Sequence, residues 1–119
     1  MNTEPLVKGK IVFEEVARLF TGATMCVRLE RITAADIASE VVADCVERDL
    51  AFDPTTSNDL SFAIAGNPPD PQASYAVRVH IDIDGDGEVS QGDFISMQSY
   101  PVITFGHPRE VSILVRQVK

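Results

Sequence analysis

The sequence contains no tryptophan, and it has only two tyrosines, two cysteines and two histidines. This scarcity of aromatic rings counts against a sugar-binding surface. No apolar run approaches the roughly 18 to 20 residues that a membrane-spanning helix needs, so no direct membrane span is expected. A length of 119 residues with 45% apolar residues instead indicates one folded domain with its own core.

Basic residues are also scarce. The 10 lysines and arginines are outnumbered by 18 acids, which gives a formal net charge of −8. Such a surface repels nucleic acid and anionic lipid, so we expect neither as a partner. Part of this charge is local, because residues 82–93 hold five acids and no lysine or arginine.

The two cysteines, Cys26 and Cys45, fit no zinc-binding or redox spacing. Their segments are predicted to be neighbouring strands, which leaves two interpretations. One is a disulfide across the two strands. The other, which we favour, is a pair of small half-buried residues with free thiols.

A secretory leader is lacking too, since residues 1–10 contain no apolar core of a signal peptide. Two expectations of equal weight follow: the protein is cytoplasmic, or its leader has been removed. If a leader has been removed, the expected location is the periplasm or the outer-membrane surface.

Alternating apolar and polar residues predict strands along most of the chain. Turn signals separate these segments, so we predict an all-β fold: a β-sandwich of about seven mainly antiparallel strands. Residues 1–6 are expected to be a disordered tail, and residues 7–119 one sandwich domain. The expected strands are residues 9–15, 23–32, 37–49, 61–65, 75–81, 94–105 and 110–118.

Two of these segments carry more specific predictions. In residues 37–49, one register points Val41, Ala43 and Cys45 inward, although the Ala- and Glu-rich residues 34–46 also allow a helix. In residues 94–105, Pro101 predicts a bulge or an edge position, because proline cannot donate a ladder hydrogen bond.

Residues 82–93 (DIDGDGEVSQGD) match the spacing of the EF-hand calcium loop. Calcium takes six to eight oxygen ligands, and alternating carboxylates supply them when the chain wraps around one point. Gly87 permits the sharp turn that follows the third acid, and Val89 is expected to tie the loop to the core or to a strand. The predicted ligands of a structural Ca²⁺ ion are Asp82, Asp84, Asp86, Glu88 through its carbonyl, Ser90 and Asp93.

The competing interpretation is an acidic turn without metal, since Asp-Gly pairs form good turns. A turn does not need four adjacent carboxylates, which repel one another unless a cation neutralises them, so we favour the metal. Asp93 replaces the usual glutamate, and the flanking segments are predicted to be strands rather than helices. The loop is therefore expected to be a structural clip and not a sensor.

No catalytic motif accompanies this loop, and an enzyme is not predicted. No Gly-x-Ser-x-Gly elbow, partnered Cys and His pair or phosphate-binding glycine loop is present. His107 belongs to a Gly-His-Pro turn and is expected at the surface. His80 adjoins the acidic loop, where it is either a surface residue, which we favour, or a metal ligand or partner of a ligand.

Three segments resemble a known family. They are GKIVF, ATMCVRLERITAADIASEVVAD and YAVRVHIDIDGDGEVSQGDFISMQSYPVITFG. Together they are similar to the small lipoproteins that include the YbaY proteins and the type III secretion lipoprotein chaperones (YscW-like pilotins). The resemblance spans about residues 7–118.

This resemblance implies a β-sandwich without enzymatic activity, held in the envelope by a lipidated N-terminal cysteine that the sequence does not contain. Our first hypothesis is a non-enzymatic envelope accessory protein that binds calcium structurally and binds another protein, such as an outer-membrane or secretion component. The alternative is a calcium-dependent adhesion or carbohydrate-binding module. A small-molecule substrate is not expected.

Overall fold

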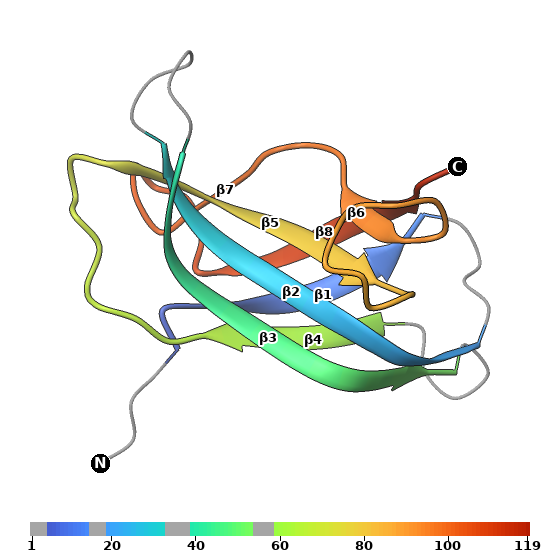
Figure 1. Ribbon diagram of the computed structural model, residues 1–119. Helices are drawn as coiled ribbons and strands as arrows, with labels where there is room; N and C mark the ends of the chain where they lie inside the picture. The colour runs from blue at the N-terminus through green and yellow to red at the C-terminus, as the bar shows by residue number, and fades with distance from the viewer. Residues whose placement is uncertain (1–4, 15–18, 33–38, 54–58) are drawn as a thin grey trace.

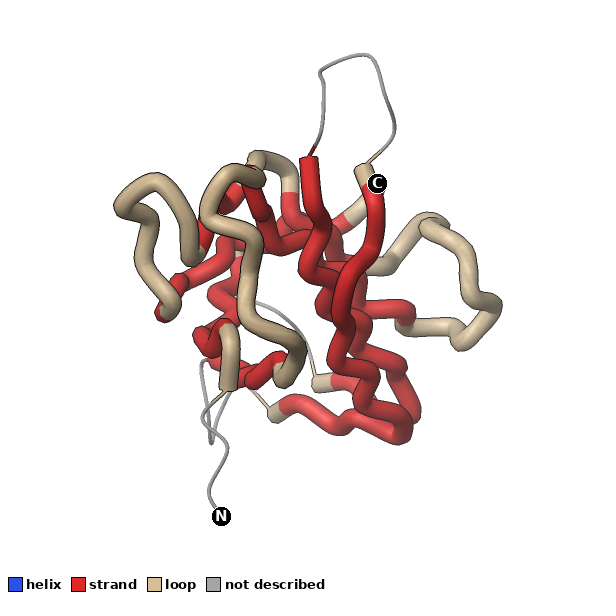
Figure 2. Tube along the Cα trace, turned by 90° about the vertical axis from the view of Figure 1, so that its left-hand side faces the viewer, coloured by secondary structure: helices blue, strands red, loops and turns tan. Residues whose placement is uncertain are grey.

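The computed structural model describes residues 5–14, 19–32, 39–53 and 59–119. Eight strands and no helix are found in these ranges (Figures 1 and 2), which confirms the all-β prediction. The strands are β1 (Val7–Phe13), β2 (Phe20–Ile32), β3 (Glu40–Phe52), β4 (Asp59–Ile64), β5 (Ser74–Asp82), β6 (Phe94–Ser96), β7 (Tyr100–Val102) and β8 (Glu110–Gln117).

Hydrogen bonds link all eight strands into one mixed sheet in the order β3-β2-β5-β6-β8-β1-β4, with β7 paired to β5. The pairs are antiparallel except for β1 and β8, which run parallel. The sheet curls so that its two end strands, β3 and β4, approach each other and nearly close a barrel-like shape (Figure 1). A sandwich of two separate sheets is therefore not confirmed, because one continuous sheet encloses the core.

The core lies inside this curled sheet. On β2 the predicted inward residues Met25, Val27 and Leu29 are buried. On β5 the predicted inward residues are buried as well: Tyr75, Val77, Val79 and Ile81. Each fully buried aliphatic side chain contributes about 1.5–3 kcal/mol relative to an exposed one. One region of the interior is aromatic, where Phe13 packs against the rings of Phe20, Phe52 and Phe94.

Gly9 allows β1 and β8 to approach each other. A Cβ atom at this position would lie 1.9 Å from the backbone oxygen of Val111, far inside van der Waals contact. Gly9 is also the first residue of the GKIVF segment. The glycine in that segment is thus explained by close contact between two parallel strands.

The predicted inward register of β3 is only partly correct. Ala43 and Cys45 pack against the core, but Val41 is 46% exposed. The reason is a register shift: Leu29 pairs with Ala43, whereas the next residue, Glu30, pairs with Val41. Val42 is the extra residue, so the alternation of faces reverses there. The alternative helix over residues 34–46 is wrong for residues 40–46, which belong to a strand. Residues 34–38 lie outside the described part of the chain.

The predicted long strand at residues 94–105 is wrong in its continuity. It is divided into β6 and β7, which both pair with β5 and are separated by residues 97–99. Pro101 lies within β7, opposite Ala76, and β7 is off the main path of the sheet. The chain leaves strand geometry after Val102, because Ile103 and Phe105 have φ values of 61° and 55°.

The two cysteines are free and half-buried, as the favoured interpretation predicted. Cys26 is opposite Val46, whereas Cys45 is opposite Val27. A shift of one residue in register places two side chains on opposite faces of a sheet. A disulfide between Cys26 and Cys45 is therefore incompatible with this pairing.

At the N-terminus, most of the predicted tail lies outside the described residues, which begin at Pro5. Leu6 packs against the core, and its backbone N–H donates a hydrogen bond of 2.8 Å to the Ile64 carbonyl. Over the ranges that the structure covers, there is no helix long and apolar enough to cross a membrane.

Candidate functional site

The acidic loop connects β5 to β6, as the sequence predicted. Asp82 is the last residue of β5, and Asp93 immediately precedes β6. The two strands pair at their facing ends, where His80 is opposite Ile95 and Ile81 is opposite Phe94. The loop is therefore held at both ends by backbone pairing.

Asp82 organises the first half of the loop. Its carboxylate is only 5% exposed and accepts hydrogen bonds from the backbone N–H groups of Gly85 (3.0 Å) and Gly87 (2.7 Å). Both glycines have positive φ angles, 74° and 80°, which turn these N–H groups toward the carboxylate. The sharp turn predicted at Gly87 is confirmed.

Asp93 organises the second half and is fully buried. One of its oxygens accepts a hydrogen bond from Ile83 N (2.9 Å), and the other accepts one from Ser90 N (3.0 Å). The Nε2 atom of His80 lies 2.8 Å from the same oxygen as Ser90. His80 is therefore the partner of a predicted ligand, so its favoured interpretation as a plain surface residue is wrong.

Four predicted ligands converge. One carboxylate oxygen from each of Asp82, Asp84, Asp86 and Asp93 lies within 4.8 Å of the others. The pKa of Asp84 is below its ordinary value, mainly because of a hydrogen bond with the Asp82 side chain. Desolvation acts in the opposite direction and raises this pKa. This set of hard oxygen atoms fits the ligand preference of calcium.

The remaining predicted residues take different positions. The Ser90 hydroxyl belongs to the cluster, since it donates to Asp84 Oδ2 at 3.1 Å. Glu88 is exposed, and its backbone N–H donates to Asp86 Oδ1 at 2.9 Å. Val89 is 57% exposed, so of its two expected anchors, the core and a strand, the core is wrong.

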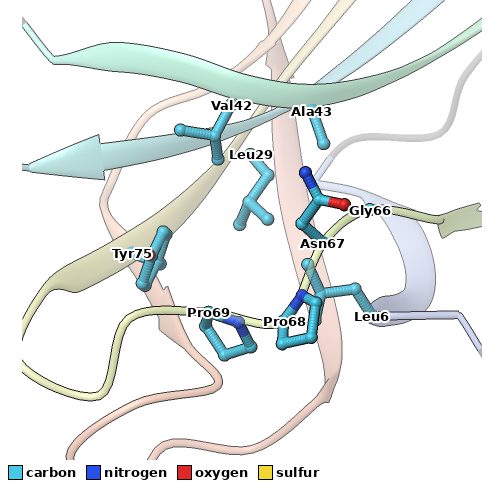
Figure 3. Close-up of a pocket in the computed structure, with 9 residues that line it drawn as sticks. All are labelled: Leu6, Leu29, Val42, Ala43, Gly66, Asn67, Pro68, Pro69 and Tyr75. Atoms are coloured by element: carbon cyan, nitrogen blue, oxygen red, sulfur yellow. The ribbon is translucent and has the colours of Figure 1, made fainter.

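A second feature, which the sequence did not reveal, is a pocket of about 200 Å³ between β3 and the segment that follows β4 (Figure 3). We call it the seam pocket, because it lies where the two end strands of the sheet approach without pairing. Its lining residues are Leu6, Leu29, Val42, Ala43, Gly66, Asn67, Pro68, Pro69 and Tyr75.

The walls of the seam pocket come from specific local structure. Val42 reaches it because of the register shift in β3, and Pro68 and Pro69 form the opposite wall (Figure 3). Tyr75 is buried, and its hydroxyl accepts a hydrogen bond of 2.9 Å from Asp70 N, which fixes the proline-rich segment to β5. This proline-rich segment belongs to residues 66–74, which lie between two of the strands that the sequence predicted.

Comparisons with known proteins agree with this architecture. The family model of the type III secretion system lipoprotein chaperone (YscW) matches residues 2–115. An alternative pilotin from the type II secretion system of Vibrio cholerae has a similar solved structure, with a TM-score of 0.75 and 22% identity. The match covers 95% of this chain and 96% of that one. A search of curated proteins found no match.

The fold is thus that of a small all-β protein similar to a pilotin. Because the family model covers nearly the whole sequence, the chain belongs to the YscW family of type III secretion system lipoprotein chaperones. The resemblance read from the three sequence segments is confirmed.

Proposed function

We propose that this chain is a non-enzymatic, protein-binding module of the bacterial envelope that binds a segment of a secretion-system component. Membership in a family of lipoprotein chaperones supports this proposal. It also supports a periplasmic or outer-membrane-associated location. The observation that carries the binding role is the seam pocket, a hollow whose lining residues are mostly apolar, at the unpaired junction of the sheet.

The dimensions of the seam pocket favour a side chain over a free ligand. Small-molecule sites typically measure about 300–1,000 Å³, and this pocket has only about 200 Å³. Val42 is 44% exposed and lines the pocket, so its apolar surface gains from contact with another apolar group. We infer that one large apolar side chain of the partner enters here while the surrounding chain contacts β3.

The partner class follows from the family. The solved neighbour is itself described as a pilotin of a secretion system. We therefore propose a secretin as the partner. The test is to measure binding of the purified chain to the periplasmic part of a secretin from the same genome by isothermal titration calorimetry. A saturable 1:1 complex supports the proposal. Absence of binding at high micromolar concentrations to every secretin of that genome contradicts it.

We further propose that the acidic loop binds one Ca²⁺ ion as a structural clip between β5 and β6. Asp82, Asp84, Asp86 and Asp93 would supply carboxylate oxygens, with Ser90 and the Glu88 carbonyl completing the set. Convergence of the four carboxylates supports this proposal. Against it stands the acidic turn without metal, in which backbone N–H groups already satisfy Asp82 and Asp93.

Thermal unfolding in EDTA and in calcium separates these two interpretations. Binding to the folded state alone stabilises by about 2.7 kcal/mol when calcium is at 100 times its Kd, so the melting temperature should rise. The double variant Asp84→Asn with Asp86→Asn should lose this rise, because both side chains are exposed and contribute mainly charge. Equal melting temperatures for the wild type in EDTA and in millimolar calcium would eliminate the clip.

A further inference from the structure

A second hollow, of about 220 Å³, lies on the outer face of the sheet and is distinct from the seam pocket. We call it the arginine pocket. Its polar residues come from three strands: Cys26 and Arg28 from β2, Arg78 and His80 from β5, and Ser96 from β6. Ile95 of β6 and Val89 of the acidic loop add apolar walls.

Arg28 and Arg78 are directly opposite each other in the β2–β5 ladder. Like charges in this position destabilise a sheet, because their side chains are held side by side. The arrangement is unusual in a chain with a net charge of −8 and only 10 basic residues. A bound anion between the two guanidinium groups would remove the repulsion.

Among the described residues, Arg78 forms an ion pair and Arg28 does not. Glu30 lies 3.5 Å from Arg78 and forms an ion pair with it. Arg28 forms no ion pair within the described ranges, although Asp44 is its neighbour in the β2–β3 register. The His80 ring already has a carboxylate partner, because its Nε2 atom lies 2.8 Å from Oδ2 of Asp93. The pocket thus matches a group with a single negative charge better than a phosphate dianion.

The other walls define what surrounds that charge. Val89 is 57% exposed and projects from the loop beside the half-buried Ile95. Ser96 accepts a hydrogen bond from Val79 N through its hydroxyl oxygen (3.0 Å), so its own O–H remains able to donate. Arginine binds a carboxylate through two parallel hydrogen bonds. An apolar group next to that carboxylate in the ligand would cover the exposed Val89 side chain.

We propose that the arginine pocket binds a glutamate or aspartate side chain that lies beside apolar residues in a protein partner. Arg28 provides the charge-assisted hydrogen bonds, and Arg78 adds a second positive charge. The proposal does not depend on the seam pocket, since the two hollows share no lining residue.

The test uses an acetylated and amidated peptide, Leu-Leu-Glu-Leu-Leu, titrated into the ¹⁵N-labelled chain and followed by NMR. The amides of Val79, Ile95 and Ser96 should shift. The peptide with glutamine in place of glutamate should bind about two- to fivefold more weakly, as expected for the loss of one partly exposed ion pair. Equal binding of both peptides would overturn the proposal.

Single substitutions test whether the glutamate peptide binds at the arginine pocket. Arg28→Gln should weaken binding of the glutamate peptide about three- to fivefold, and Arg28→Lys should restore part of the loss. Arg48→Gln on β3 is the matched control, since Arg48 is an exposed arginine outside the pocket, and it should leave the affinity unchanged. Equal losses for Arg28→Gln and Arg48→Gln would contradict the assignment.

Two further probes distinguish the source of the anion. N-acetyl-leucine carries a free carboxylate next to an apolar side chain, and inorganic phosphate carries no apolar group. Both should bind more weakly than the glutamate peptide. Tighter binding of N-acetyl-leucine would indicate a small carboxylate ligand, and tighter binding of phosphate an inorganic-anion site. Either result would overturn the assignment to a protein partner.

Discussion

The Nε2 atom of His80 lies 2.8 Å from Oδ2 of Asp93, and this contact joins the end of β5 to the end of the acidic loop. Asp93 is fully buried and also accepts backbone hydrogen bonds from Ile83 and Ser90. A single carboxylate therefore fixes the start, the end and one flanking strand of the loop, whether or not a cation is bound.

Replacing Asp93 with alanine should destabilise the protein by about 2 kcal/mol in EDTA, because it leaves the partly buried N–H groups of Ile83 and Ser90 without an acceptor. Urea denaturation followed by circular dichroism measures this loss. Asp86→Ala is the matched control in the same loop: its side chain is exposed and accepts one local hydrogen bond, from Glu88 N. A loss for Asp93→Ala no larger than that for Asp86→Ala would contradict the role of Asp93.

Gly9→Ala should cost about 1–3 kcal/mol, the usual range for overpacking, because the new Cβ would clash with the Val111 backbone oxygen. The same denaturation assay applies. Lys8→Ala changes an exposed residue of the same strand and should have little effect. Unchanged stability of the Gly9→Ala variant would show that β1 and β8 do not approach as closely as described.

The thiols of Cys26 and Cys45 should both remain free after mild oxidation of the folded protein. Their side chains point to opposite faces of the β2–β3 ladder, so no local rearrangement of rotamers brings the sulfur atoms together. Unfolding in an alkylating reagent followed by mass spectrometry counts the modified cysteines. A product with neither cysteine alkylated and an internal disulfide would disprove this register.

The ion pair of Glu14 and Arg116 should give a small dependence of stability on pH. A hydrogen bond from Arg116 lowers the pKa of Glu14 from 4.5, its ordinary value. Because the folded-state pKa is the lower one, the stabilisation is present above about pH 4.5 and is lost as the pH falls through the folded-state value.

The melting temperature of Glu14→Gln should therefore be slightly below that of the wild type at pH 7, and the difference should shrink as the pH falls below 4.5. Glu14 is exposed, so added salt should also reduce the difference. A difference that does not shrink as the pH falls would mean that the Glu14 side chain acts through packing and not through its charge.

The sequence predicted those parts of the fold that depend on alternation over a long segment. The alternate residues from Met25 to Leu29 and from Tyr75 to Ile81 were correctly placed inward, because the side chains of a half-buried strand repeat every two residues. The loop between β5 and β6 was found because ligand spacing and glycine positions are local properties. The family resemblance was found because three segments preserve such local patterns.

What the sequence could not predict depends on contacts between distant segments. The register shift at Val42 exists only in the pairing of β3 with β2, so the pattern of β3 alone gave the wrong face for Val41. The seam pocket requires β3 to meet Pro68 and Pro69 across the ends of the sheet. The pairing of Arg28 with Arg78 likewise depends on the register between β2 and β5, which neither segment reveals by itself.

The most direct test of the binding role compares two variants of β3 in the secretin titration. Val42 and Val41 are adjacent and almost equally exposed, at 44% and 46%, but only Val42 lines the seam pocket. Val42→Glu should weaken binding at least about tenfold, because an unpaired charge would enter an apolar contact. Val41→Glu should change the affinity less than about twofold. Equal affinities for the two variants would contradict a partner bound in the seam pocket.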